Sequence, residues 1–109
     1  METILWYNYL AAFFAGVILT NAVPHFIHGI SGDKFPTPFS KPAGKGLSSP
    51  MVNTLWSCFN LFIGYILFRV SEISSNDKIL LFVFFIGIVS ISVFSSINFQ
   101  KKQKDNGTE

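Results

Sequence analysis

The sequence predicts an all-α membrane protein with three transmembrane helices and a long, Pro/Gly-rich interfacial loop between the first two. Half of the 109 residues are hydrophobic and only 13% are charged, whereas a soluble domain carries about 25% charged residues. Charged residues are absent from the stretches 3–32, 46–68 and 79–100. Each stretch holds an apolar run of about 20 residues, the length of helix that crosses a hydrocarbon layer of about 30 Å.

The first span is predicted over residues 4–23. Trp6 and two tyrosines lie near its start, where amphipathic aromatic rings favour the boundary between headgroups and hydrocarbon. Pro24 lacks a backbone donor and restricts the residue before it, so the helix is expected to stop or kink there. No Lys or Arg precedes the run, and the run is longer than the core of a secretory signal peptide. We therefore expect a retained span.

The second span is predicted over residues 51–68 and the third over residues 79–97. Ser48-Ser49-Pro50 precedes the second span. A serine oxygen caps a helix N-terminus and proline suits the first turn, so this tripeptide is a start signal. The three spans form one transmembrane domain, residues 1–100, followed by a short polar tail, residues 101–109.

The distribution of positive charge predicts the orientation in the membrane. With three spans, the first loop and the C-terminal tail share one side of the membrane. The only basic residues on the other side are Arg69 and Lys78. Positive residues are retained in the cytoplasm, so the N-terminus is expected outside and the C-terminus in the cytoplasm. The basic residues on the side of the loop and tail are Lys34, Lys41, Lys45, Lys101, Lys102 and Lys104.

The connection over residues 24–49 differs in composition from the spans. It contains four of the five prolines, four of the eight glycines and both histidines. A loop of this length without helical or strand periodicity is typically functional or mobile. Phe35, Pro38 and Phe39 belong to a segment that should be extended, since residues before proline are disfavoured from helix. Its two phenylalanines are expected to dip into the membrane surface, as part of an interfacial or re-entrant loop.

The second span carries a polar face. Asn53, Ser57, Asn60 and Gly64 are spaced by 4, 3 and 4 residues, which places them on one side of a helix. An amide that faced lipid would leave its donors unsatisfied at a cost of several kcal/mol. This face is therefore expected to meet another helix, the loop or water, and Asn21 adds a second amide beside the loop. It serves either as helix packing or as a ligand or ion path.

Small residues recur every four positions in the first span, at Asn8, Ala12, Gly16 and Thr20. This spacing lets two helices approach closely. The simplest assembly packs this face against the amide face of the second span, with the loop folded over the junction.

The two histidines of the loop allow three interpretations. His25 and His28 share one face of a helical turn, because they are three residues apart. They serve as hydrogen-bonding interfacial residues, as a proton relay or catalytic pair, or as ligands of a metal or haem. In the last case further ligands would come from Asp33, Asn21, Asn53 or a partner chain. A structural zinc site uses four Cys or His ligands, and this chain has only one cysteine and two histidines. We therefore expect no metal and no cofactor.

One set of motifs in the loop and its flanking spans resembles a group of small, uncharacterised bacterial integral membrane proteins. The resemblance covers roughly residues 15–65 and implies a bacterial inner membrane, without implying an activity. It rests on Asn21-x-x-Pro24-His25-Phe26-x-x-Gly29-x-x-Gly32, Phe35-x-Thr37-Pro38-Phe39 and Ser48-Ser49-Pro50-x-x-Asn53-x-x-Trp56-x-x-x-Asn60.

The leading functional hypothesis is a non-enzymatic binding or accessory component that uses the loop and the polar face of the second span. The alternative is a membrane-surface enzyme or a redox or metal protein that uses His25 and His28. Three spans enclose little space, so we expect partners in the lipid bilayer: further copies of the chain or a larger membrane complex. A net charge of +2 without a basic stripe does not favour nucleic acid.

Overall fold

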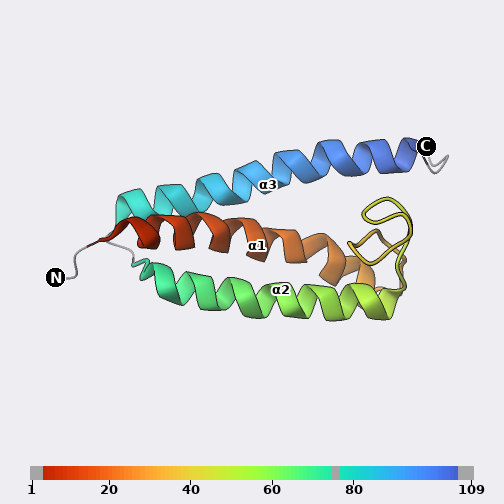
Figure 1. The fold of residues 1–109 in the computed structure, drawn as a ribbon, viewed down its shortest axis with the longest axis horizontal. Helices are drawn as coiled ribbons and strands as arrows, with labels where there is room; N and C mark the ends of the chain where they lie inside the picture. The colour runs from red at the N-terminus through yellow and green to blue at the C-terminus, as the bar shows by residue number, and fades with distance from the viewer. Residues whose placement is uncertain (1–3, 75–76, 106–109) are drawn as a thin grey trace.

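The computed structural model describes residues 4–74 and 77–105, with the side chains of residues 101–105 left aside. Within these ranges it consists of three helices, α1 (Trp6–Ile30), α2 (Pro50–Ser71) and α3 (Lys78–Asp105). Each helix is long and apolar enough to cross a membrane, which confirms the predicted fold class. Figure 1 shows the helices side by side, with α1 between α2 and α3 and the loop at one end of the bundle.

The start of α2 follows the sequence signal. Ser49 is the N-cap, its side-chain oxygen accepts a hydrogen bond from the backbone N–H of Val52 at 3.1 Å, and Pro50 occupies the first turn. At the other end, α2 closes with Glu72 in the left-handed conformation. The backbone of α3 runs to Asp105, beyond the expected end of the third span. The remainder of the predicted tail, residues 106–109, and the side chains of its three lysines lie outside the described part.

Of the two alternatives expected at Pro24, a stop or a kink, the stop is wrong. α1 contains Pro24 and continues to Ile30, so both histidines lie on the helix and the loop is residues 31–49. A proline inside a helix costs about 3 kcal/mol. Packing beyond Pro24 offsets this cost, because His25 and Gly29 are buried. A Cβ on Gly29 would collide with Thr54 of α2, so the extra turns lie directly against the start of the second helix.

The face of small residues on α1 packs against two helices instead of one. A Cβ at Gly16 would meet the backbone carbonyl oxygen of Phe84 in α3, and a Cβ at Gly87 of α3 would meet that of Phe13 in α1. Asn8 instead donates a hydrogen bond to the carbonyl oxygen of Val70 in α2, at 3.1 Å. The expectation that the whole small-residue face meets the second span is therefore wrong for Gly16. A central helix needs close approach on both sides.

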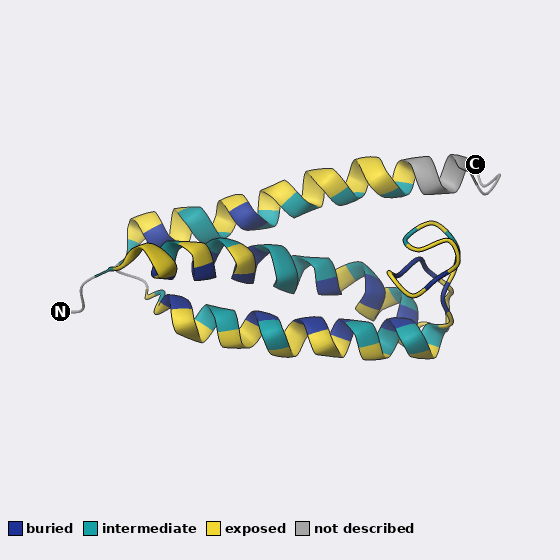
Figure 2. Cartoon of the chain, viewed as in Figure 1, coloured by how far each residue is buried: buried dark blue, intermediate teal, exposed yellow. Residues whose placement is uncertain are grey.

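The outward faces of the bundle are apolar. Figure 2 shows buried residues along the inner faces of the helices and exposed residues along their outer faces. Phe62 on α2 is 62% exposed and Phe82 on α3 is 63% exposed. Soluble proteins rarely present large contiguous apolar surfaces to water, so this exterior is suited to lipid.

Candidate functional site

The loop is a folded cap. Phe35 and Ser48 exchange two backbone hydrogen bonds, of 3.2 and 3.0 Å, in an isolated antiparallel bridge. The side-chain oxygens of Thr37 and Ser48 lie 2.6 Å apart and share a further hydrogen bond. The carbonyl oxygen of Thr37 accepts from the Ser40 hydroxyl at 2.7 Å and from the Gly44 N–H at 2.8 Å. Gly44 has a φ of +72°, which glycine adopts without steric cost.

The two phenylalanines of the extended segment have different environments. Phe39 is 64% exposed and packs edge-on against Trp56, with ring centroids 5.2 Å apart. Phe35 is only 7% exposed, and its ring contacts Phe99 of α3 at 4.7 Å. The expectation that both rings dip into the membrane surface is therefore wrong for Phe35, because the backbone bridge to Ser48 turns it into the bundle.

Asn53 joins the cap to both flanking helices. The residue is fully buried, and its Nδ2 donates to the carbonyl oxygens of Phe35 at 2.8 Å, Ser49 at 3.1 Å and Ser48 at 3.3 Å. Its Oδ1 lies 2.8 Å from Nδ1 of His25. Because carbonyl oxygens only accept, the amide orientation is fixed, and Nδ1 of His25 must be the donor. In the neutral imidazole, Nε2 is then an acceptor.

His28 packs in a different way. Its ring stacks on Phe35, with centroids 4.3 Å apart and planes within 14°, and its Nδ1 lies 3.5 Å from Oδ2 of Asp33. His25 meets the same Phe35 ring edge-on at 5.4 Å. The histidines therefore share a face, as their spacing predicts, but the face is occupied by an aromatic ring. Among the described residues, no three His, Cys, Asp or Glu side chains gather as a metal-holding group.

The rest of the polar face of α2 packs against α1. Ser57, Asn60 and Gly64 are buried. Asn60 Nδ2 donates to the carbonyl oxygen of Trp56 at 2.8 Å, and Asn60 Oδ1 accepts from Asn21 Nδ2 at 3.4 Å. Gly64 faces the side chain of Leu19. The face therefore serves helix packing in this chain, and its open part is the end beside Asn21.

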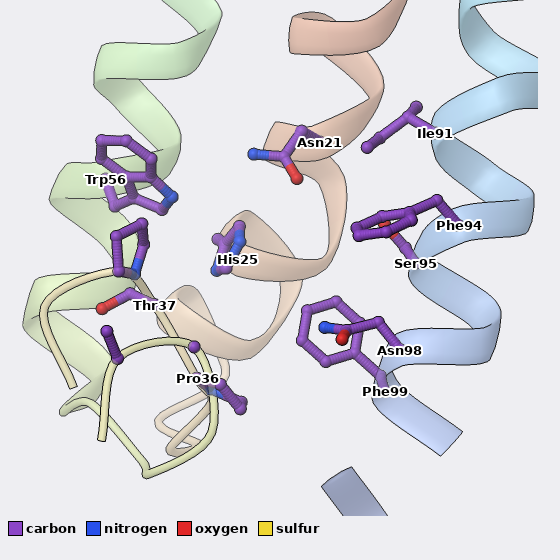
Figure 3. A pocket seen from close by; sticks show the side chains of 13 residues that line it. Asn21, His25, Pro36, Thr37, Trp56, Ile91, Phe94, Ser95, Asn98 and Phe99 are labelled. Atoms are coloured by element: carbon purple, nitrogen blue, oxygen red, sulfur yellow. The ribbon is translucent and has the colours of Figure 1, made fainter. Parts of the chain in front are cut away.

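A pocket of about 360 Å³ lies beneath the cap, between α1, α2 and α3. Figure 3 shows His25 and Asn21 reaching into it from α1, Trp56 from α2, and an aromatic row from α3. Three residues of the predicted site line it, namely Asn21, His25 and Pro38, whereas His28, Asp33 and Phe39 do not. The other lining residues are Pro36, Thr37, Ala43, Gly44, Trp56, Ile91, Phe94, Ser95, Asn98 and Phe99.

Trp56 is the main functional candidate that the sequence interpretation did not single out. Its Nε1 is buried and has no hydrogen-bond partner in the described part of the chain. Figure 3 shows this nitrogen turned toward the pocket. The sequence feature that could have identified Trp56 is its position, three residues after Asn53 and four before Asn60. This spacing places it beside the polar face of the helix. The α3 residues Ser95 and Asn98, three apart, carry a similar weak signal.

Comparison with family models, with curated proteins and with solved structures finds no match to this chain.

Proposed function

We propose that this chain is a multi-pass protein of the bacterial inner membrane whose non-enzymatic function is to bind a small amphipathic molecule in the pocket beneath the cap. The lysines on the side of the loop and tail support a cytoplasmic location for the cap and C-terminus. The pocket volume of about 360 Å³ falls within the usual range for small-molecule sites, about 300–1,000 Å³.

The observation that carries this proposal is the unpartnered indole N–H of Trp56. Buried polar groups are nearly always hydrogen-bonded, so an exception calls for an explanation. Among the described residues, only two buried side-chain nitrogen or oxygen atoms lack a hydrogen bond. They are Nε1 of Trp56 and Nδ1 of His28. The His28 nitrogen has the Asp33 carboxylate at 3.5 Å. The indole N–H of Trp56 faces the pocket, and a bound molecule would supply its hydrogen-bond acceptor.

The test is native mass spectrometry of protein released from its own membranes, with extraction and identification of the bound molecule. Ser95→Phe would fill the pocket, and Ser96→Phe places the same ring on the exposed face of α3. We expect a bound molecule in the wild-type protein and in Ser96→Phe, and its loss in Ser95→Phe. A wild-type protein free of bound molecules, or one that Ser95→Phe does not empty, would overturn the proposal.

A further part of the proposal is self-association or assembly into a larger membrane complex. Phe94 of α3 lines the pocket and is 64% exposed, so one wall of the site lies at the molecular surface. A second subunit or lipid would cover it. Crosslinking in native membranes should capture a defined oligomer or partner, and recovery of monomers alone would contradict this part.

A second candidate function is enzymatic, with His25 as a general base. It is favoured by the hydrogen bond of 2.8 Å from His25 Nδ1 to Asn53, because a fixed tautomer leaves Nε2 free to accept a proton. Extracts from the wild-type protein would then contain substrate and product, and extracts from His25→Gln only substrate. An identical single compound from both proteins would favour simple binding.

A further inference from the structure

No charged side chain of the described residues lines the pocket, and this limits what its ligand can be. Among the residues whose side chains the structure describes, those that line it include no Asp, Glu, Lys or Arg. The charged residues of the cap, Asp33, Lys34, Lys41 and Lys45, are exposed and do not line it. A charged group placed there would lose its hydration without an opposite charge in return. The part of the ligand that enters the pocket is therefore uncharged.

The two polar atoms Trp56 Nε1 and His25 Nε2 offer complementary hydrogen-bonding groups, one a donor and the other an acceptor. Nε1–H of Trp56 only donates, and it has no partner within the described residues. Nε2 of His25 accepts, because the bond to Asn53 places the proton on Nδ1. An ether or ester oxygen would satisfy the indole alone, since it has no hydrogen to donate. A hydroxyl satisfies both atoms, because its oxygen accepts from one and its hydrogen is donated to the other.

The α3 side of the pocket indicates an apolar tail. Three of its five lining residues, Ile91, Phe94 and Phe99, are apolar, and Ser95 and Asn98 are polar. The helix has the highest mean hydropathy of the three candidate spans. Phe94 is 64% exposed, so an alkyl chain that leaves the pocket along this wall continues over the apolar outer face of the bundle. The cap closes the opposite end with Pro36 and Thr37, which are both buried.

We propose that the pocket binds a neutral lipid through a hydroxyl group, which accepts a hydrogen bond from Trp56 Nε1–H and donates one to His25 Nε2, with its alkyl chain along α3. This inference rests on the proposed binding function and names the class of its ligand.

The test uses three probes of one chain length: 1-dodecanol, dodecyl methyl ether and dodecanoate. The protein, labelled with ¹⁵N at its indole nitrogens and held in phosphatidylcholine nanodiscs, is titrated with each. The chain has two tryptophans, and Trp6→Phe assigns the two indole N–H resonances. Trp6 is 72% exposed and outside the pocket, so its resonance is an internal control. We expect dodecanol to shift the Trp56 resonance with at least tenfold higher affinity than the ether or the carboxylate.

A matched pair of variants checks the role of the indole. Trp56→Phe keeps an aromatic ring beside Phe39 and Phe59 but removes the donor, whereas Trp6→Phe makes the same change elsewhere. Binding of radiolabelled dodecanol should fall about tenfold in Trp56→Phe and stay unchanged in Trp6→Phe. His25→Phe would remove the acceptor, with the folded state checked by the Trp6 resonance.

The outcomes separate the two proposals. Equal affinity for all three probes, or a preference for dodecanoate, would overturn the hydroxyl inference while leaving a binding pocket. Binding of dodecanol that Trp56→Phe leaves intact would also overturn it. Absence of binding by any probe, together with an empty wild-type protein in native mass spectrometry, would overturn the binding function itself.

Discussion

The two faces on which α1 packs are built from different chemistry. Toward α2 it presents polar side chains, and Asn8, Asn21 and His25 each make a hydrogen bond to that helix. Toward α3 it presents glycine and backbone, with Gly16 beside the carbonyl oxygen of Phe84 and a reciprocal glycine on α3. Within the described residues, no side-chain hydrogen bond joins α1 to α3.

This difference indicates a division of roles. Directional hydrogen bonds fix how α1 and α2 lie along each other, whereas small residues allow close contact through dispersion. The polar interface also continues into the cap through Asn53. As a result, hydrogen bonds connect α1, α2 and the cap around the pocket, whereas α3 approaches α1 through glycine and backbone. The polar residues of α1 and α2 are therefore held by hydrogen bonds, whereas Phe94 on the α3 wall is 64% exposed at the surface of the bundle.

The largest effect is expected for Asn53→Leu. The substitution leaves the buried His25 Nδ1 without its acceptor, which costs about 1–3 kcal/mol. It also removes three hydrogen bonds to the carbonyl oxygens of Phe35, Ser48 and Ser49, each worth about 1 kcal/mol, although each oxygen keeps a backbone donor. We expect a loss of about 3 kcal/mol or more in the free energy of unfolding. Phe62→Leu, on the exposed face of the same helix, is the control. The measurement is equilibrium unfolding in mixed micelles, and equal effects of the two changes would contradict a central role for Asn53.

The next effect tests the apolar interface. Gly16→Ala would place a methyl group against the backbone of Phe84, and backbone cannot move aside as a flexible side chain can. Overpacking of this kind costs about 1–3 kcal/mol. We expect a wider distance between α1 and α3, measured by spin labels, with the α1–α2 distance unchanged. Ala12→Gly, in the same helix, serves as the control because it removes a methyl group where Gly16→Ala adds one. A change at the α1–α2 interface would show that the two interfaces are not independent.

The sequence predicted those parts of the molecule that depend on local chemistry or on periodicity. The absence of charge located the three helices, the Ser49 cap located the start of α2, and residue spacing located the buried face of Asn53, Ser57, Asn60 and Gly64. The predicted helix end at Pro24 was wrong because burial of the residues after it outweighed the local tendency of proline to end a helix.

The candidate site was only partly predictable for the same reason. His25 and Asn21 were found as polar residues in an apolar context, but their partners lie on other elements. Trp56 was not singled out, because its importance depends on a buried nitrogen without a partner and on a pocket that it shares with residues of the cap and α3. Long-range contacts of this kind leave no periodic signal in a single sequence.

A smaller effect is expected at the start of the polar interface. Ser49→Ala removes the side-chain acceptor for the Val52 N–H, and loss of a serine cap costs about 1 kcal/mol. Ser49→Asp should restore the stability, because aspartate is an equally good cap. Hydrogen exchange of the first turn of α2 measures the effect locally. Unchanged exchange in Ser49→Ala would mean that Asn53 and Pro50 hold this turn without the cap.

The smallest effect concerns the hydrogen bond between Asn21 and Asn60, and it tests how far the polar interface depends on side-chain pairs. The donor and acceptor are 3.4 Å apart, and Asn60 is also held by the carbonyl oxygen of Trp56 in its own helix at 2.8 Å. A double-mutant cycle of Asn21→Ala and Asn60→Ala should therefore give a coupling of only about 0.6 kcal/mol, the average for hydrogen bonds between membrane helices. Unfolding of the two single variants and the double variant measures it. A coupling above about 2 kcal/mol would exceed what such pairs contribute in membranes. It would mean that the two amides hold each other across the pocket wall, so that the polar interface extends further from the cap than the bonds of Asn53 indicate.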